Sequence, residues 1–278
     1  MTLEEALETP ALRVTEKDGG AEVGELAVEN SGDRPVFLQA GDTLQGGKHD
    51  RTIAKDTLVP PRSGKVLVRA FCVEPGRWSQ RASSERGAGA SRQTLATSEA
   101  DFRGNDVPVA TKEQRLAIQL EGDQGRVWES GRKAIQALSP GNDSYVLASQ
   151  DGTLRDKMRA YLDALEPLFA GKEEIVGMAY AINGKVASAE IYGTTGLLHR
   201  FWPKLMRRSM LEAMAARGSD TARAPTVEAV ERFLRETAQV PESQEAAGAG
   251  LERSVRRGSG SVRFDARCAG ARVYTRFD

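Results

Sequence analysis

The feature that most constrains the fold is an Asn-Gly pair between two apolar runs. Asn183-Gly184 separates residues 175–182 from residues 185–192, and both runs are rich in Ile, Val, Ala and Tyr. A two-residue Asn-Gly connection favours a type I′ turn, because both central residues need positive φ. The sequence therefore predicts an antiparallel hairpin over residues 175–192.

Helices are predicted on both sides of this hairpin. Apolar residues recur at helical spacing over 154–169, with Gly171 as the C-cap, and again over 197–214. Proline is tolerated mainly in the first turn of a helix, so we expect the second continuous helix to begin at Pro203. A shorter helix is predicted over 226–239, where apolar residues again recur every three to four positions.

Residues 11–78 have the pattern of short strands. Apolar runs alternate with turn-forming stretches such as Asp18-Gly19-Gly20 and Asn30-Ser31-Gly32-Asp33. Pro60-Pro61 requires the strand over 57–59 to end there or to run along a sheet edge. This spacing predicts antiparallel hairpins in a sandwich or small barrel. Strands return in the tail at 261–264 and 271–275, where a final strand is placed to pair with an earlier sheet.

The predicted fold class is α+β. We expect a β-rich N-terminal sandwich or small barrel packed with a helix–hairpin–helix unit, carrying two mobile insertions in one composite domain. The expected segments are 1–78 (β-rich, with the site), 79–112 (a Ser-, Arg- and Gly-rich loop, either solvated or a lid), 113–215 (helix–hairpin–helix) and 216–278 (linker, short helix and C-terminal strands).

The charge balance limits the classes of partner. The 278 residues contain 39 Lys plus Arg and 39 Asp plus Glu, for a net charge of zero, which argues against binding nucleic acid. The acidic start of the chain does not resemble a signal peptide, and no apolar run is long enough to span a membrane. We therefore expect no membrane association. Only Cys72 and Cys268 are cysteines, so we expect free thiols and a cytoplasmic location. The sequence leaves the oligomeric state open.

Arginines crowd the C-terminus. They are either solvated side chains of strands and loops or a phosphate-binding patch, and they comprise Arg253, Arg256, Arg257, Arg263, Arg267, Arg272 and Arg276.

Most of the reactive side chains lie in two clusters, residues 41–51 and 72–78, and each cluster follows an apolar extended run. Functional groups are often placed at such strand ends. The candidate acid/base residues are Glu74, Asp42 and Asp50. The candidate ligand-binding residues are Lys48, Arg51, Arg77, Trp78, Gly46 and Gly47.

Each candidate has a chemical reason and a plainer alternative. Carboxylates at strand ends can act as general acids or bases, and the glycine pair can offer backbone N–H groups to an anion. The cofactor is unknown, and a divalent metal held with His49 is one option, although the spacing matches no standard motif. Alternatively, these charges form a structural ion-pair network, and Trp78 packs in the core instead of stacking on a base.

Cys72 has two interpretations. Along its strand, Val66, Val68, Ala70, Cys72 and Glu74 share one face, which favours a buried and inert thiol. As a nucleophile, Cys72 would need a base or cation nearby, which requires the two clusters to meet in space.

These clusters carry a family resemblance. Gly41-Asp42, the run 46–51, Pro60-Pro61 and the Cys-Val-Glu-Pro-Gly-Arg-Trp string at 72–78 resemble the ADP-ribosylglycohydrolase and rhodanese-phosphatase-associated protein domain family. The similarity continues through Gly177 and 201–205, so it covers residues 1–215. The chain departs from the family pattern at Asp42, where Glu is commoner, and at His49, where Gln is commoner.

The resemblance implies an association with ADP-ribose and phosphate handling, and it assigns no catalytic residue. We therefore expect an enzyme that acts on a nucleotide- or ADP-ribose-like phosphorylated small molecule. The alternatives are a non-catalytic nucleotide-binding or regulatory module, or clusters that are purely structural.

Overall fold

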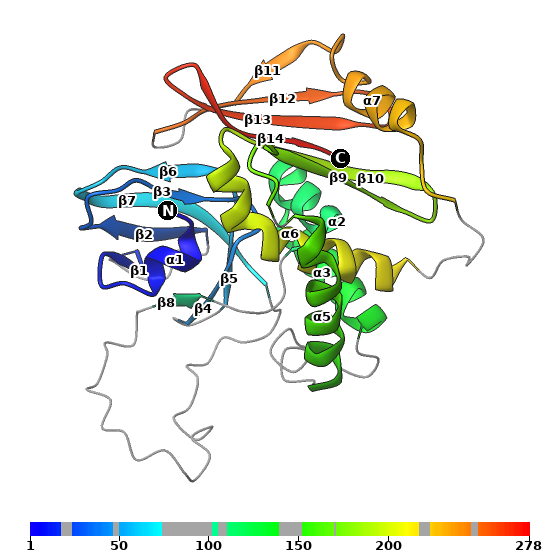
Figure 1. Ribbon diagram of the computed structural model, residues 1–278. Coiled ribbons are helices and arrows are strands. Elements are labelled where there is room, and N and C mark those ends of the chain that lie inside the picture. Colours follow the sequence, from blue (N-terminus) through cyan, green and yellow to red (C-terminus); the bar gives the residue numbers. More distant parts are fainter. Residues whose placement is uncertain are drawn as a thin grey trace. The chain divides into compact units, whose positions relative to one another are not determined.

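The computed structural model describes residues 1–17, 24–46, 50–73, 102–104, 110–138, 152–169, 171–216, 223–245 and 250–278. The chain forms two compact units, unit 1 (Met1–Arg132) and unit 2 (Lys133–Asp278), each with its own sheet (Figure 1). The boundary between them falls inside the predicted 113–215 segment. The units therefore do not follow the predicted segments, although the mixture of strands and helices confirms the α+β class.

Unit 1 is built on a six-stranded antiparallel sheet in the order β1-β2-β7-β5-β4-β8, and a separate pair is formed by β3 and β6. The edge strands β1 and β8 contact each other, so the sheet curls in the manner of a small barrel. The strands are β1 (Leu12–Glu16), β2 (Glu25–Asn30), β3 (Val36–Leu38), β4 (Thr43–Gly46), β5 (Arg51–Ile53), β6 (Thr57–Val59), β7 (Ser63–Cys72) and β8 (Phe102–Gly104).

The alternation of side chains in β7 sets the core of unit 1. Val68, Ala70 and Cys72 are buried on one face, as the sequence predicts, whereas Leu67 on the other face is 52% exposed. The buried face joins a cluster with residues of β1 and β2 such as Val14 and Leu26. β6 ends at Val59, immediately before the two prolines that cannot donate to a ladder.

The helices of unit 1 begin at conventional capping residues. Thr2 and Glu5 form a capping box at α1 (Leu3–Leu7), and the Thr111 hydroxyl accepts from Gln114 N at the start of α2 (Lys112–Leu116). α2 continues as a π-helix, η2 (Ala117–Glu121), which ends at Gly122 with φ 62°. α3 (Gln124–Leu138) follows and crosses the boundary between the units.

The expectation of a loop over 79–112 is wrong in part. β8 lies inside this range and pairs with β4, with Leu44 opposite Gly104 and Gly46 opposite Phe102. Three residues give no detectable periodicity, and the pairing with β4 stabilises the strand. Residues 74–101 and 105–109 lie outside the described residues, as do 217–222 and 246–249, so the predicted mobility of these insertions stays a prediction.

Unit 2 contains a second six-stranded antiparallel sheet, in the order β11-β12-β13-β14-β10-β9. The predicted hairpin is confirmed as β9–β10, with φ 51° at Asn183 and φ 78° at Gly184. β14 pairs with β10, so the C-terminal strands join the hairpin to complete one sheet. The strands are β9 (Gly177–Ile182), β10 (Lys185–Tyr192), β11 (Glu242–Gln244), β12 (Glu252–Arg257), β13 (Val262–Cys268) and β14 (Ala271–Phe277).

The helices of unit 2 correct one prediction. They are α5 (Gly152–Leu165), the 3₁₀ turn η3 (Glu166–Leu168), α6 (Thr195–Ala215) and α7 (Val227–Arg235). Pro203 lies inside α6, not at its start, because the Thr194 hydroxyl caps the helix by accepting from Leu197 N. Proline removes one intrahelical hydrogen bond, while buried Phe201 and Leu205 keep the helix packed across that position. Among the described helices, none combines the length and apolar character needed to cross a membrane.

Candidate functional site

The two sequence clusters meet at one end of the unit 1 sheet. Arg51 in β5 lies directly opposite Cys72 in β7, and the N–H of Val73 donates to the carbonyl oxygen of Asp50 at 3.2 Å. The first cluster therefore enters β5 where the second cluster leaves β7. We call this edge, formed by Asp50, Arg51, Cys72 and Val73, the β5–β7 end.

Arg51 is held beneath this end by two partners. Its Nη1 donates to Cys72 Sγ at 2.7 Å, and its Nη2 pairs with the Glu16 carboxylate of β1 at 3.1 Å. The guanidinium is almost fully buried. Arg51 thus links β1, β5 and β7 and is committed to the fold in this arrangement.

Cys72 is a buried thiol with a raised pKa. Burial is the main factor that raises the pKa of Cys72, Glu16 adds to it, and the Arg51 guanidinium only partly offsets it. A thiol with a raised pKa is a poor nucleophile at neutral pH. The structure therefore favours the core interpretation of Cys72, with Arg51 as its hydrogen-bond donor.

The backbone of Cys72 is fixed by a residue that the sequence did not single out. Gln124, the first residue of α3, accepts from Cys72 N at 2.9 Å and donates to Cys72 O at 2.7 Å. The start of α3 therefore lies beside the β5–β7 end. The only signal for it in the sequence is Gly122-Asp123, a plausible helix start.

Asp42 lies away from the β5–β7 end. Its carboxylate accepts from Gln39 N at 2.9 Å, and its backbone carbonyl accepts from Ile53 N at 2.8 Å. Because Asp50 precedes Ile53 by three residues, the two aspartates are separated by about 10 Å along the strand at ~3.3 Å per residue. The sequence grouped Asp42 with Asp50 around one pocket, and this geometry separates them.

Two side chains fix the backbone of Ala40, which precedes the turn at Gly41-Asp42. Asp56 Oδ1 accepts from Ala40 N at 2.8 Å, and Arg115 Nε donates to Ala40 O at 3.1 Å. Gly41 follows with φ 92°, and a Cβ there would lie 2.9 Å from Arg115 Cγ. These contacts hold the turn that carries Asp42, and nothing in the sequence pattern marks Asp56 or Arg115 for this role.

Most of the remaining candidates lie outside the described part of the chain. Glu74, Arg77, Trp78, Gly47 and Lys48 lie outside the described residues, as does His49, and Gly46 is described only as the last residue of β4. In the described part of the chain, no group of three or more His, Cys, Asp or Glu side chains is arranged to hold a metal ion.

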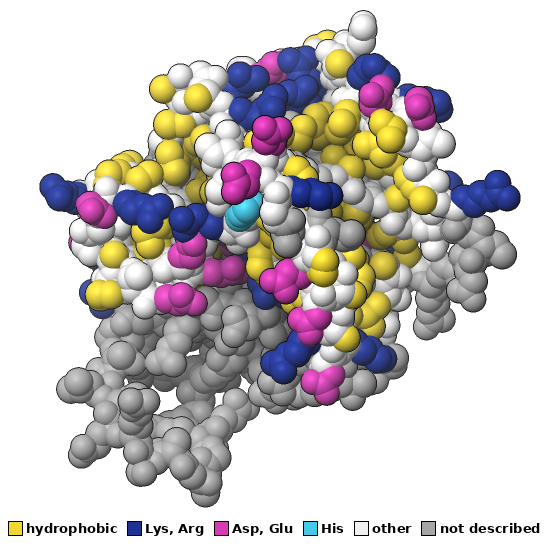
Figure 2. Space-filling view, viewed as in Figure 1, with side chains coloured by type: hydrophobic (Ala, Val, Ile, Leu, Met, Phe, Trp, Pro, Cys, Tyr) yellow, Lys and Arg dark blue, Asp and Glu magenta, His cyan; other side chains and the backbone are white. Residues whose placement is uncertain are grey.

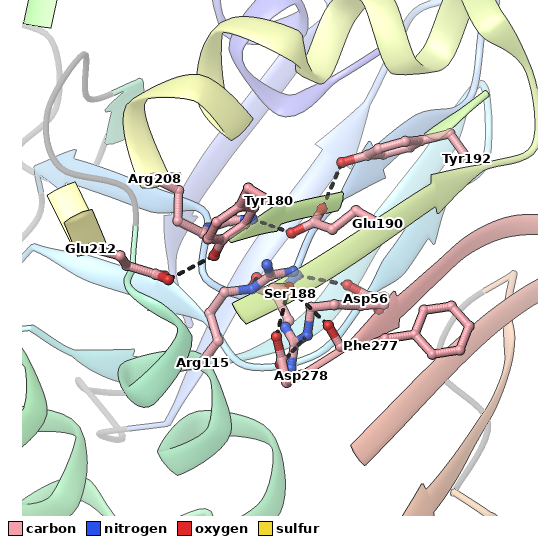
Figure 3. Close-up of polar contacts among 12 residues, drawn as sticks. Asp56, Arg115, Tyr180, Ser188, Glu190, Tyr192, Arg208, Glu212, Phe277 and Asp278 are labelled. Carbon is pink, nitrogen blue, oxygen red and sulfur yellow. Dashed lines mark hydrogen bonds and ion pairs between the residues drawn. The ribbon is translucent and has the colours of Figure 1, made fainter. Parts of the chain in front are cut away.

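Unit 2 contains a buried polar network that the sequence analysis missed (Figure 3). Arg208 of α6 forms an ion pair with Glu190 of β10, and the Tyr192 hydroxyl donates to the same carboxylate at 2.9 Å. All three side chains are almost fully buried. A buried charged pair interrupts the apolar periodicity of its strand and its helix, so the periodicity does not predict it.

Two further polar contacts extend this network. The Tyr180 hydroxyl donates to Glu212 at 2.6 Å, and burial together with the Glu212 charge raises the pKa of Tyr180 well above its ordinary value. The Ser188 hydroxyl donates to Asp278 Oδ1 at 2.9 Å, and Asp278 also pairs with Arg276. Figure 3 shows these side chains on β9, β10 and α6 and at the C-terminal end of β14.

The C-terminal arginines are largely paired. Figure 2 shows basic and acidic side chains interspersed over the region of β11–β13. The ion pairs are Arg253–Glu245, Arg256–Glu242, Arg263–Asp265 and Arg276–Asp278. Arg257, Arg267 and Arg272 are exposed. Carboxylates close to four of these arginines argue against a dedicated phosphate patch.

Comparison with known proteins defines the family. No curated protein and no solved structure matches the chain. The family match extends beyond the segment identified from the sequence, because it includes residues 216–275, which form part of the unit 2 sheet. With the match running over residues 1–275, the chain belongs to the family described as the ARG and Rhodanese-Phosphatase-superfamily-associated Protein domain.

Proposed function

We propose that unit 1 binds a phosphorylated small molecule of the nucleotide or ADP-ribose class at the β5–β7 end, and that it acts on this molecule as an enzyme. One observation carries the proposal: the pairing of Arg51 with Cys72 and the Val73–Asp50 hydrogen bond bring both clusters to one edge. Residues that are more than twenty positions apart in the sequence thereby lie next to each other in the sheet.

The chemistry at this edge suits an anion. Lys48 precedes Asp50 by two residues, and Arg77 follows Val73 by four. Lysine and arginine are the usual partners of phosphate oxygens, and backbone N–H groups of Gly46 and Gly47 would add to them. The N-terminal end of α3, which carries the positive end of its helix dipole, lies beside Cys72 through Gln124.

The proposed catalytic groups are Asp50 and Glu74. Either carboxylate would serve as a general acid or base toward a phosphate ester, or as an oxygen ligand for a divalent metal. Asp42 is not proposed as a catalytic group, because its carboxylate accepts from Gln39 N and caps the turn there. Arg51 acts as a buried support for the site, since its guanidinium is occupied by Glu16 and Cys72.

The family name supports the ligand class. It associates the domain with ARG proteins and with the rhodanese-phosphatase superfamily. We read ARG as ADP-ribosylglycohydrolase, which makes ADP-ribose the first ligand to test. Both cysteines are free in the structure, which fits a reducing compartment and a cytoplasmic location.

A non-catalytic nucleotide-binding module is the second candidate. Asp42 and Arg51, two of the groups first considered for the site, are engaged in contacts within the fold. The candidates that remain could bind an anion, whereas the set of acid/base candidates is smaller than the sequence suggests.

The deciding experiment has two stages. Calorimetric titration of ADP-ribose, AMP and inorganic phosphate, each with and without Mg²⁺, should give saturable binding to one of them. Glu74→Gln and Asp50→Asn should then bind that ligand but lose turnover if the chain is an enzyme. Saturable binding without turnover by the unmodified protein would favour the binding module, and absence of binding to all three compounds contradicts the proposal.

A further inference from the structure

A side chain binds the end of β7 on its β2 side. Among the described residues, the last backbone contact on that side is from Ala70 N to Gly24 O at 2.9 Å. At Cys72, two residues further along, the side-chain amide of Gln124 bonds both backbone groups, at 2.9 Å and 2.7 Å. One side chain thus satisfies a donor and an acceptor that would otherwise need a neighbouring strand.

The other side of β7 is fixed at the same level. Val73 N donates to Asp50 O, and Arg51 donates to Cys72 Sγ. Val73 is therefore held by β5 on one side, and the preceding residue, Cys72, is held by Gln124 on the other. Such double fixation orients the edge where Asp50 lies.

An unusual backbone feature presents Gln124 to this edge. The π-helix η2 closes with Gly122 N bonded to Ala117 O at 3.0 Å, and Gly122 adopts φ 62°. Asp123 then caps α3 by accepting from Arg126 N at 2.9 Å. π-helical turns are rare and recur at functional sites, which is an observation independent of the Gln124 hydrogen bonds.

We propose that Gln124 is a positioning residue for the site at the β5–β7 end. It holds Cys72 and Val73 in register with Asp50, and it thereby sets the geometry in which the edge meets a phosphorylated ligand. This inference rests on the proposed function, because a site without a ligand needs no positioning. Misplacement of a binding group by about 1 Å can cost as much as ~100-fold in activity.

The test uses the full chain and ADP-ribose, with inorganic phosphate as a second probe. Gln124→Leu removes both hydrogen bonds at similar side-chain size, and Gln124→Glu keeps only the acceptor for Cys72 N. Gln136→Leu is the matched control, because Gln136 lies on the same helix and is exposed. Affinities are measured by calorimetry well below each variant's Tm, and stability is measured separately by urea unfolding.

We expect Gln124→Leu to weaken ADP-ribose binding by roughly ten-fold or more, Gln124→Glu to fall between it and the unmodified chain, and Gln136→Leu to bind normally. A merely structural Gln124 would lower the urea midpoint while leaving the affinity unchanged, and that result overturns the inference. If Gln124→Leu does not fold, the affinity of Gln124→Glu decides by the same criterion. Failure of the unmodified chain to bind ADP-ribose, AMP and inorganic phosphate alike overturns the proposed function itself.

Discussion

Arg51 and Cys72 lie opposite each other in β5 and β7, and the Arg51 guanidinium donates to the Cys72 sulfur at 2.7 Å. In the sequence the first looks like an anion binder and the second like a possible nucleophile. In the structure each is the other's buried partner, and Glu16 completes the contact at 3.1 Å. The consequence is a sheet edge at which the two clusters meet through their described residues Asp50, Arg51, Cys72 and Val73.

Replacing Arg51 should destabilise the chain strongly. Arg51→Ala leaves Glu16 and Cys72 without their donor, and removal of one partner from a buried ion pair costs about 3–5 kcal/mol. The free energy of unfolding in urea measures this effect. Arg69→Ala, at an exposed position of β7, is the control and should change it little. If both substitutions lower the free energy of unfolding equally, the contacts of Arg51 with Glu16 and Cys72 do not stabilise the fold specifically.

The two cysteines should differ in reactivity. Cys72 is buried with a raised pKa, whereas Cys268 is only partly buried. We expect iodoacetamide at pH 7.5 to label Cys268 first, and Cys72 to react only when the chain is unfolded in urea. Peptide mass spectrometry after timed labelling distinguishes the two sites. Preferential labelling of Cys72 in the folded chain would point to a thiolate instead.

The raised pKa of Cys72 also predicts a pH dependence of stability. The folded state holds this proton more tightly than the unfolded state, whose thiol has a pKa near 9.0. The stabilisation is thus fully present below that pH and is lost as pH rises toward the folded-state pKa. Between pH 8 and pH 10.5, the free energy of unfolding in urea should fall more steeply for the unmodified chain than for Cys72→Ala. Parallel curves would contradict the assignment.

Asp42 should affect stability and not ligand binding. Asp42→Ala removes the acceptor for Gln39 N, and an unsatisfied buried donor costs about 1–3 kcal/mol. Because Asp42 lies away from the β5–β7 end, the affinity for ADP-ribose should stay that of the unmodified chain. Urea unfolding and calorimetry on the same preparation give both values. Loss of affinity with unchanged stability would return Asp42 to the site.

The unit 2 network should show strong coupling between Glu190 and Arg208. Either single substitution, Glu190→Gln or Arg208→Met, should destabilise by about 3–5 kcal/mol, and the double variant should lose much less than their sum. The exposed pair Arg235–Glu231, with side chains 71% and 54% exposed, should contribute only about 0–0.5 kcal/mol. Urea unfolding of the variants in both double-mutant cycles measures the two coupling energies. If the losses in the free energy of unfolding are additive for Glu190 and Arg208, the two residues do not form a specific pair.

Local chemistry made several elements predictable. The β9–β10 hairpin follows from the positive φ that Asn183 and Gly184 both adopt. The end of β6 follows from the missing N–H of Pro60. Pro203 misled the prediction, since packing of Phe201 and Leu205 carries α6 through the proline.

Of the candidate site, the sequence shows the two clusters but not their meeting. The two clusters are visible in the sequence, but their meeting depends on the pairing of β5 with β7, which is a long-range choice of register. Gln124 and Glu16 reach the β5–β7 end from distant segments, and no periodicity encodes such contacts. The same reason hid Arg208 and Glu190, because a buried ion pair between a helix and a strand interrupts the apolar pattern on both.

Hydrogen–deuterium exchange with ADP-ribose tests most directly whether the two clusters form one ligand site. Peptides that cover residues 44–53 and 70–80 should be protected together on adding ADP-ribose, and Arg77→Ala should abolish both effects. Peptides from α6, which lies in unit 2, should be unchanged. Protection of only one of the two segments, or of neither while α6 responds, would contradict a shared site at the β5–β7 end.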